Sequence, residues 1–122
     1  MTRPMTSARF PASVRLRKRA DFARVYLRRC SVSDALLLIF VDDNGLDHPR
    51  IGLSVSRKVG GAVVRNRWKR LLREAFRLSQ SQLPAGLDII AIPRPDAEPA
   101  LGPLSESLVR LASRAAKKLV KG

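Results

Sequence analysis

The spacing of hydrophobic positions changes along the chain, and each change marks an expected element of secondary structure. From about residue 19 to residue 29, Phe22, Val25 and Tyr26 recur at helical spacing while the arginines fall elsewhere, which predicts a short amphipathic helix. The apolar run at about 36–42 is too short for a typical helix and precedes the turn-rich segment DDNGLDHP. We therefore expect a strand there.

Two further segments are expected to form strands. Residues 50–58, RIGLSVSRK, alternate strictly, which predicts a strand with one buried face and one open face. The buried face would hold Ile51, Leu53 and Val55, and the open face Arg50, Gly52, Ser54, Ser56 and Lys58. Residues 87–93, LDIIAIP, predict a strand that ends at Pro93, because proline cannot donate a hydrogen bond to a ladder. A loop is expected at 94–103.

Two longer helices complete the expected domain. Helical periodicity resumes at 62–79, after the glycines at 60 and 61, and again from about Pro103 to residue 119, where leucines and alanines form one stripe. The order helix, two strands with room for a third, helix, strand, helix predicts one α+β domain at 15–119, an α/β sandwich in which a small mixed sheet packs against helices. Residues 1–14 contain two prolines and two arginines without any period, and predict a flexible basic arm.

Charge indicates the kind of partner. The 122 residues include 24 Lys and Arg against 10 Asp and Glu, a formal net charge of +14, which favours a polyanion. Nucleic acid is the first candidate and an anionic membrane surface the second. No apolar run approaches the roughly 20 residues that a membrane-spanning helix needs, so we expect a cytoplasmic protein without a membrane partner.

No set of residues typical of an enzyme active site is evident. One cysteine, Cys30, and one histidine, His48, provide neither an internal disulfide nor a Cys/His metal site. Asp42, Asp43 and Asp47 could bind a hydrated cation, but aspartates so placed more often stabilise a turn. A protein nuclease is therefore disfavoured, and we expect neither a catalytic residue nor a bound metal.

The helix expected at 62–79 separates its charge from its apolar residues. At 100° per residue, Val64, Trp68, Leu71, Leu72, Ala75 and Leu78 fall on one side, and Arg65, Asn66, Lys69, Arg70, Arg73 and Arg77 on the other. Cations four residues apart repel each other by a few tenths of a kcal/mol per pair, and only Glu74 offsets them. Guanidinium groups so placed match phosphate oxygens. Contact with RNA or DNA is thus favoured over a merely solvated face.

Aromatic residues raise a second possibility. Phe22 and Tyr26 stand one turn apart, and Phe40 lies on the first expected strand, so the three rings could meet beside the open Gly/Ser face and stack on unpaired bases. An aromatic pair at this spacing is equally typical of a core, and the pattern leaves both alternatives open. Trp68, in contrast, is expected in the core.

The segment GLSVSRKVGGAVVRNRWKRLLREAFR, residues 52–77, resembles the protein subunit of bacterial ribonuclease P. The resemblance rests on RNR at 65–67, KR at 69 and 70, the arginine at 73 and the preceding GLSVSRK. It extends through RLRKRADFARVY at 15–26 and DIIAI at 88–92 and covers most of 15–119. Two residues depart from the family: Trp68 replaces a smaller residue, and Arg29 lies near a position that is often glycine.

The resemblance implies a function. In that family a catalytic RNA, which requires Mg²⁺, removes the 5′ leader of precursor tRNA, and the protein binds both RNAs without a cofactor or small-molecule substrate of its own. The residues that would face the catalytic RNA are Arg65, Asn66, Arg67, Lys69, Arg70 and Arg73. The leader-binding cleft would comprise Phe22, Tyr26, Phe40, Ser54, Ser56, Arg57 and Lys58. The resemblance also implies a left-handed crossover between the GLSVS and DIIAI strands. The alternative is a basic, ribosome-associated structural RNA-binding protein, which would lack an open aromatic cleft.

Overall fold

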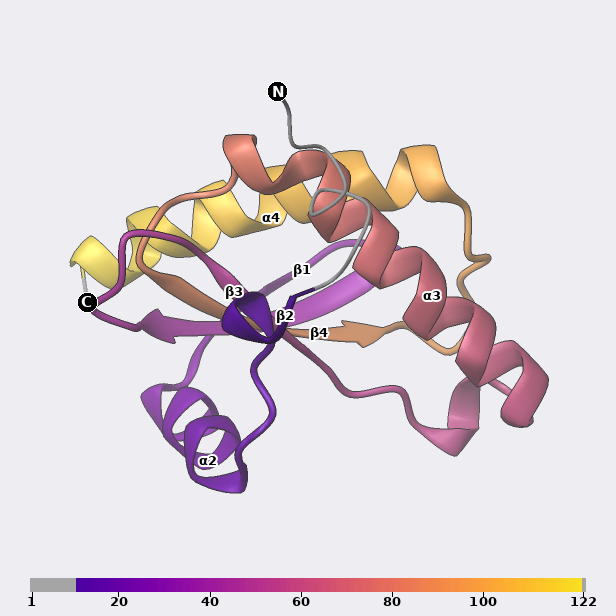
Figure 1. The fold of residues 1–122 in the computed structure, drawn as a ribbon. Helices are drawn as coiled ribbons and strands as arrows, with labels where there is room; N and C mark the ends of the chain where they lie inside the picture. Colours follow the sequence, from indigo (N-terminus) through magenta and orange to yellow (C-terminus); the bar gives the residue numbers. More distant parts are fainter. Residues whose placement is uncertain (1–10, 122) are drawn as a thin grey trace.

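The computed structural model describes residues 11–121, which form a four-stranded sheet with helices on both faces (Figure 1). The helices are α2 (Arg19–Arg28), α3 (Ala62–Ser79) and α4 (Leu101–Lys121), and the strands are β1 (Cys30–Ser33), β2 (Leu37–Asp43), β3 (Arg50–Leu53) and β4 (Leu87–Pro93). Short 3-10 helices occur at Ala12–Val14, Arg57–Val59 and Gln80–Gln82. The predicted α+β class and the order of the elements are confirmed.

The sheet has the strand order β1-β2-β4-β3. β2 pairs antiparallel with both β1 and β4, whereas β3 and β4 are parallel, so the sheet is mixed as expected. Ile89 of β4 lies opposite both Val41 of β2 and Ile51 of β3, which aligns the apolar positions of the three strands on one face. α3 joins the parallel pair, and this is the connection for which the resemblance implies a left-handed crossover.

α3 and α4 cover one face of the sheet and bury the main core (Figure 1). The largest fully buried side chains there include Trp68, Phe76, Leu108, Leu111 and Ile39. Burial of each such side chain stabilises the fold by about 1.5–3 kcal/mol. Trp68 is 1% exposed, which confirms its expected place in the core.

α2 packs on the opposite face and is tied to the sheet by one buried carboxylate. Asp88 of β4 is fully buried and accepts two hydrogen bonds of 2.8 Å from Arg50 of β3 and one of 2.9 Å from Asn44. Arg24 of α2 also donates a hydrogen bond to the Asp88 carboxylate, and it donates another to the Asp42 carboxylate at 2.8 Å. Burial alone raises the pKa of Asp88, but the hydrogen bonds from Arg50, Asn44 and Arg24 outweigh it and hold the pKa below its ordinary value.

β3 is shorter than predicted. It ends at Leu53, and Arg57 and Lys58 lie on a 3-10 helix instead of a strand. The Ser54 amide still donates to the Ala91 carbonyl at 3.0 Å, but the next bond of a parallel ladder would need an N–H from Pro93, which proline lacks. The chain therefore leaves the sheet and turns toward α3.

Three further boundaries can be compared with the prediction: β1, the segment before α2 and the start of α4. β1, at Cys30–Ser33, is the further strand for which the prediction left room, and it pairs with β2 at the sheet edge. In the last part of the expected arm at 1–14, Ala12–Val14 form a 3-10 helix and Val14 is buried. Just after it, the Leu16 amide donates to the Ile51 carbonyl at 2.8 Å. The rest of that expected arm, residues 1–10, lies outside the described residues. α4 begins at Leu101, two residues before the proline that marked its expected start.

Asp34 closes the turn between β1 and β2 and links it to α4. Its carboxylate accepts hydrogen bonds from the amides of Leu36 (2.8 Å) and Leu37 (3.0 Å), from the Ser107 hydroxyl (2.5 Å) and from Arg110 (2.8 Å). Burial raises the pKa of Asp34, but these bonds outweigh it and lower the pKa to about 2.

We predict that Asp34→Asn lowers the free energy of unfolding by roughly 2 kcal/mol at pH 7, because each unit of pKa shift corresponds to about 1.4 kcal/mol. The folded-state pKa lies below the ordinary value of 3.8, so the carboxylate stabilises the fold above about pH 4. That stabilisation is lost as the pH falls from about 4 to 2. Urea unfolding at several pH values should show the gap between wild type and variant closing in acid. A gap that stays constant with pH would contradict the assignment.

Candidate nucleic-acid interface

The cationic side of α3 stands free of the core. Five of its six predicted RNA-facing residues are cations, and we refer to the set as the α3 ridge: Arg65, Asn66, Arg67, Lys69, Arg70 and Arg73. Arg65 and Lys69 are half-buried at its border with the core, and the other four are exposed. The single acid of this helix, Glu74, is engaged by Arg77, whose Nε lies 3.1 Å from Glu74 Oε1. The ridge therefore keeps its charge.

The apolar side of α3 differs in part from the prediction. Val64 and Leu78, expected on that side, are 39% and 50% exposed because they lie near the two ends of the helix. Phe76, which was not among the residues expected on the apolar side, is fully buried. In the first turn of α3, the Nε of Arg65 is buried and has no hydrogen-bond partner in the described part of the chain. A buried donor without a partner costs about 1–3 kcal/mol.

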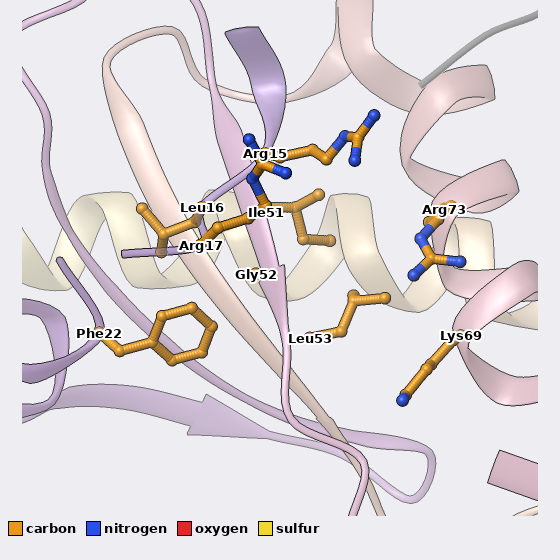
Figure 2. Close-up of a pocket in the computed structure, with 9 residues that line it drawn as sticks. All are labelled: Arg15, Leu16, Arg17, Phe22, Ile51, Gly52, Leu53, Lys69 and Arg73. Atoms are coloured by element: carbon orange, nitrogen blue, oxygen red, sulfur yellow. The ribbon is translucent and has the colours of Figure 1, made fainter. Parts of the chain in front are cut away.

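A pocket of about 300 Å³ lies between α3 and the edge of the sheet. Figure 2 shows Lys69 and Arg73 extending from α3 toward β3, which carries Ile51, Gly52 and Leu53. Arg15 and Arg17 line the same pocket from the segment before α2, and Phe22 lies at its far side. Among residues 11–121, four cations and no carboxylate line this pocket, so it suits an anion.

Arg15 and Arg17 were not among the predicted site residues. Their sequence signal is the alternation RLR, in which Leu16 is 3% exposed and packs into the small core beneath α2. Arg15 forms a parallel bridge with Ile51, so this segment adds to the free edge of β3. Only that pairing places the two arginines opposite α3.

The three predicted aromatic residues meet in one cluster. The Phe22 and Tyr26 ring centroids are 6.4 Å apart, and those of Tyr26 and Phe40 are 4.9 Å apart in an edge-to-face arrangement. All three side chains are half-buried and pack against Leu16, Val25 and Ile90. The cluster is thus both the rim of a small core and an accessible surface.

The expected open Gly/Ser face is only partly open. Gly52 is buried, because the Phe22 ring covers it so closely that a Cβ at this position would lie 2.6 Å from Phe22 Cζ. Ser54 is half-buried, and Ser56, Arg57 and Lys58 are exposed. Ser56 also caps the following 3-10 helix by accepting a hydrogen bond from the Lys58 amide at 3.2 Å.

The residues considered for catalysis have structural partners. His48 lies 3.0 Å from Asp47 Oδ1 and 3.0 Å from the Ser13 carbonyl, which fits a role in its loop. Asp42 is paired with Arg24, and Cys30 is buried. Within residues 11–121 no group of three or more His, Cys, Asp or Glu is placed to hold a metal ion. In the same part of the chain, no helix has the length and apolarity needed to span a membrane.

Comparison with known proteins identifies the family. A profile of the family described as Ribonuclease P matches residues 10–116. The ribonuclease P protein component of Brevibacillus brevis is 40% identical over 111 residues, covering 89% of this chain and 86% of the relative. That of Alkaliphilus oremlandii is 46% identical over 80 residues, 66% of this chain and 70% of the relative.

Solved structures agree with the sequence matches. The ribonuclease P protein from Thermotoga maritima superposes with a TM-score of 0.72 at 34% identity, covering 82% of this chain and 96% of that one. The protein from Staphylococcus aureus gives a TM-score of 0.71 at 36% identity, with 84% and 94% covered. These matches support the ribonuclease P interpretation over a ribosome-associated protein. The chain therefore belongs to the family of ribonuclease P protein components.

Proposed function

We propose that this chain binds the catalytic RNA of ribonuclease P through the α3 ridge and the 5′ leader of precursor tRNA through the aromatic cluster. The leader-binding cleft would also include Ser54, Ser56, Arg57 and Lys58. The observation that carries this proposal is the pocket that joins the two surfaces, since Phe22 lines it from one side and Lys69 and Arg73 from the other. A single-stranded leader leaving the cluster would meet cations at once. We place the protein in the cytoplasm with its RNA partners.

The α3 ridge suits a folded RNA. Its cations repel one another along one helix and lack a matching set of acids, so phosphate groups would relieve a repulsion that the free protein carries. Arginines and lysines in such an array release counterions when they neutralise phosphates, which drives binding at low salt.

The aromatic cluster suits an unpaired strand. Its rings are half-buried, so each keeps an accessible part, and stacking of a base on such a ring contributes roughly 1–3 kcal/mol. Arg57 and Lys58 are exposed at the end of the Gly/Ser segment and would neutralise the phosphates of the same strand.

Catalysis is assigned to the RNA partner. Hydrolysis of a phosphodiester needs metal ions held by clustered carboxylates, or a general acid and base. In the described part of the chain Asp42 and Asp88 are occupied by arginines, and His48 holds its loop to Ser13. Mg²⁺ would therefore serve the RNA, and the protein's cations would lower the concentration of Mg²⁺ that the RNA needs.

For the α3 ridge, we predict that Arg65→Ala, Lys69→Ala and Arg73→Ala each make binding to the RNA subunit less dependent on salt. The slope of log K against log salt should fall by about 0.7–0.9 per lost contact. Arg77→Ala is a matched control on the same helix, because Glu74 already offsets its charge. A triple ridge variant that keeps the wild-type slope would reduce the ridge to a solvated face.

For the aromatic cluster, we predict that Tyr26→Ala weakens binding of a precursor tRNA that carries its leader by about tenfold, since one stacked base is worth roughly 1–3 kcal/mol. Binding of mature tRNA should change little, and Tyr26→Phe, which keeps the ring, should resemble wild type. Equal losses for precursor and mature tRNA, with a lower melting temperature, would assign Tyr26 to the core alone.

For the location of catalysis, we predict that the purified protein leaves precursor tRNA uncut at any Mg²⁺ concentration, and that added RNA subunit restores cleavage at the 5′ junction. His48→Ala should leave the reconstituted rate nearly unchanged, because its side chain serves a loop. Gel analysis of the products tests both statements. Cleavage by RNA-free protein that is lost on mutation of Asp42, Asp43 or His48 would refute the proposal.

A further inference from the structure

A second group of cations lies at the β1 edge of the sheet, away from the α3 ridge. The group, which we term the β1-edge patch, is exposed throughout and consists of Arg28, Arg29, Arg114, Lys117 and Lys118. It combines the C-terminal end of α2 with the last turns of α4. Figure 1 shows α2 and the C-terminal end of α4 on one side of the molecule and the start of α3 on the other.

Hydrogen bonds place α4 alongside β1. Arg110 binds Asp34, just after β1, at 2.8 Å, and the Lys118 ammonium donates to the Ser31 carbonyl at 2.9 Å. Arg114 lies on the same helical stripe between these two anchors, so it also runs along this edge. Cys30, which follows Arg29 directly, has its Sγ 3.6 Å from the Ala115 carbonyl. The end of α2 therefore meets the last turns of α4.

Little negative charge offsets this patch. The sequence has no acid between residue 107 and its end, and the Asp42 carboxylate is already held by Arg24 at 2.8 Å, with Arg28 at 4.0 Å. Asp43, at the end of β2, is an exposed acid nearby. The patch thus has a net positive charge of several units.

A simpler explanation is that cations at helix C-termini interact favourably with the helix dipole. Arg29 does not fit it well. It ends α2 with φ 58° and ψ 27°, in the left-handed region, and it is the one non-glycine residue with a positive φ in the described part of the chain. Glycine is the usual residue there, since a side chain makes this conformation unfavourable. Stability alone favours glycine, whereas binding of an anion favours arginine.

We propose that the β1-edge patch is a second RNA-binding surface, which contacts the phosphodiester backbone of a structured RNA in the ribonuclease P assembly. This inference rests on the proposed RNA-binding function. A protein that adds a strand to β1 suits the edge less well, because Lys118 already occupies the Ser31 carbonyl and like charges line the edge.

The two surfaces are far enough apart to act separately. β1 and β3 are the two edges of the sheet, three strand spacings of about 4.8 Å apart. That separation of about 14 Å exceeds the Debye length of about 8 Å at physiological salt. Contacts at the patch should therefore add their own contribution to the salt dependence of binding.

The test uses the double variant Arg29→Gly, Lys117→Gln in the full chain. Fluorescence anisotropy would measure binding to labelled ribonuclease P RNA and, separately, to mature tRNA across a salt series. Loss of two phosphate contacts should lower the slope of log K against log salt by about 1.4–1.8 for one of these RNAs, and the RNA affected identifies the source of the backbone. The melting temperature should stay the same or rise, because glycine relieves the left-handed conformation.

Two further variants make the result decisive. Arg29→Lys, Lys117→Arg keeps both charges and should retain the wild-type slopes. The triple ridge variant Arg65→Ala, Lys69→Ala, Arg73→Ala is measured in parallel. Unchanged slopes for both RNAs with the patch variant would overturn this inference. If that variant also had a lower melting temperature, the two cations would serve only to stabilise the helices through the helix dipole. A ridge variant without effect would instead count against the proposed function.

Discussion

The buried carboxylate of Asp88 is the contact on which the arrangement of the candidate site depends. It lies on the central strand β4 and accepts hydrogen bonds from Arg50 of β3, Arg24 of α2 and Asn44 of the β2–β3 loop. An ionised group without exposure to solvent needs such partners, because a lone buried charge is very costly. α2 is the helix that carries Phe22 and Tyr26. The aromatic cluster is therefore held in place by an interaction at the other end of the same sheet face.

The two faces of the sheet divide stability from binding. One face is covered by α3 and α4 and buries most of the large side chains. Within residues 11–121, the short helix α2 is the only helix on the opposite face, which leaves the aromatic rings half-buried and a small core of Leu16, Val25 and Ile90 beneath them. Partial cover is what allows this face to serve both purposes, because rings that pack on one side can still stack on the other.

The arginines divide in a similar way. Arg24, Arg50 and Arg110 bind carboxylates of other elements and hold those elements together, whereas Arg77 binds Glu74 within α3. The α3 ridge and the β1-edge patch have few acids near them, so their charge is directed outward. An ion pair carries no net charge, so the net charge of +14 reflects the cations in excess of the acids, such as those of these two surfaces.

Periodicity in the sequence determined the α+β class, the long helix α3 and the burial of Trp68, because a sustained period of 3.6 or 2 requires one face to be buried wherever the element packs. The strand β4 was evident instead from its short apolar run, which ends at a proline. Periodicity also sorted the cations of α3 onto one side. It could not reveal β1, which has four residues and only one strongly apolar side chain, or the end of β3, which depends on a missing N–H in Pro93 of another strand. The sequence likewise left open whether Phe22, Tyr26 and Phe40 meet, and whether Arg15 and Arg17 face Lys69 and Arg73. Tertiary structure alone decided both, because those groups are distant in the chain and only strand pairing and the Asp88 contact bring them together.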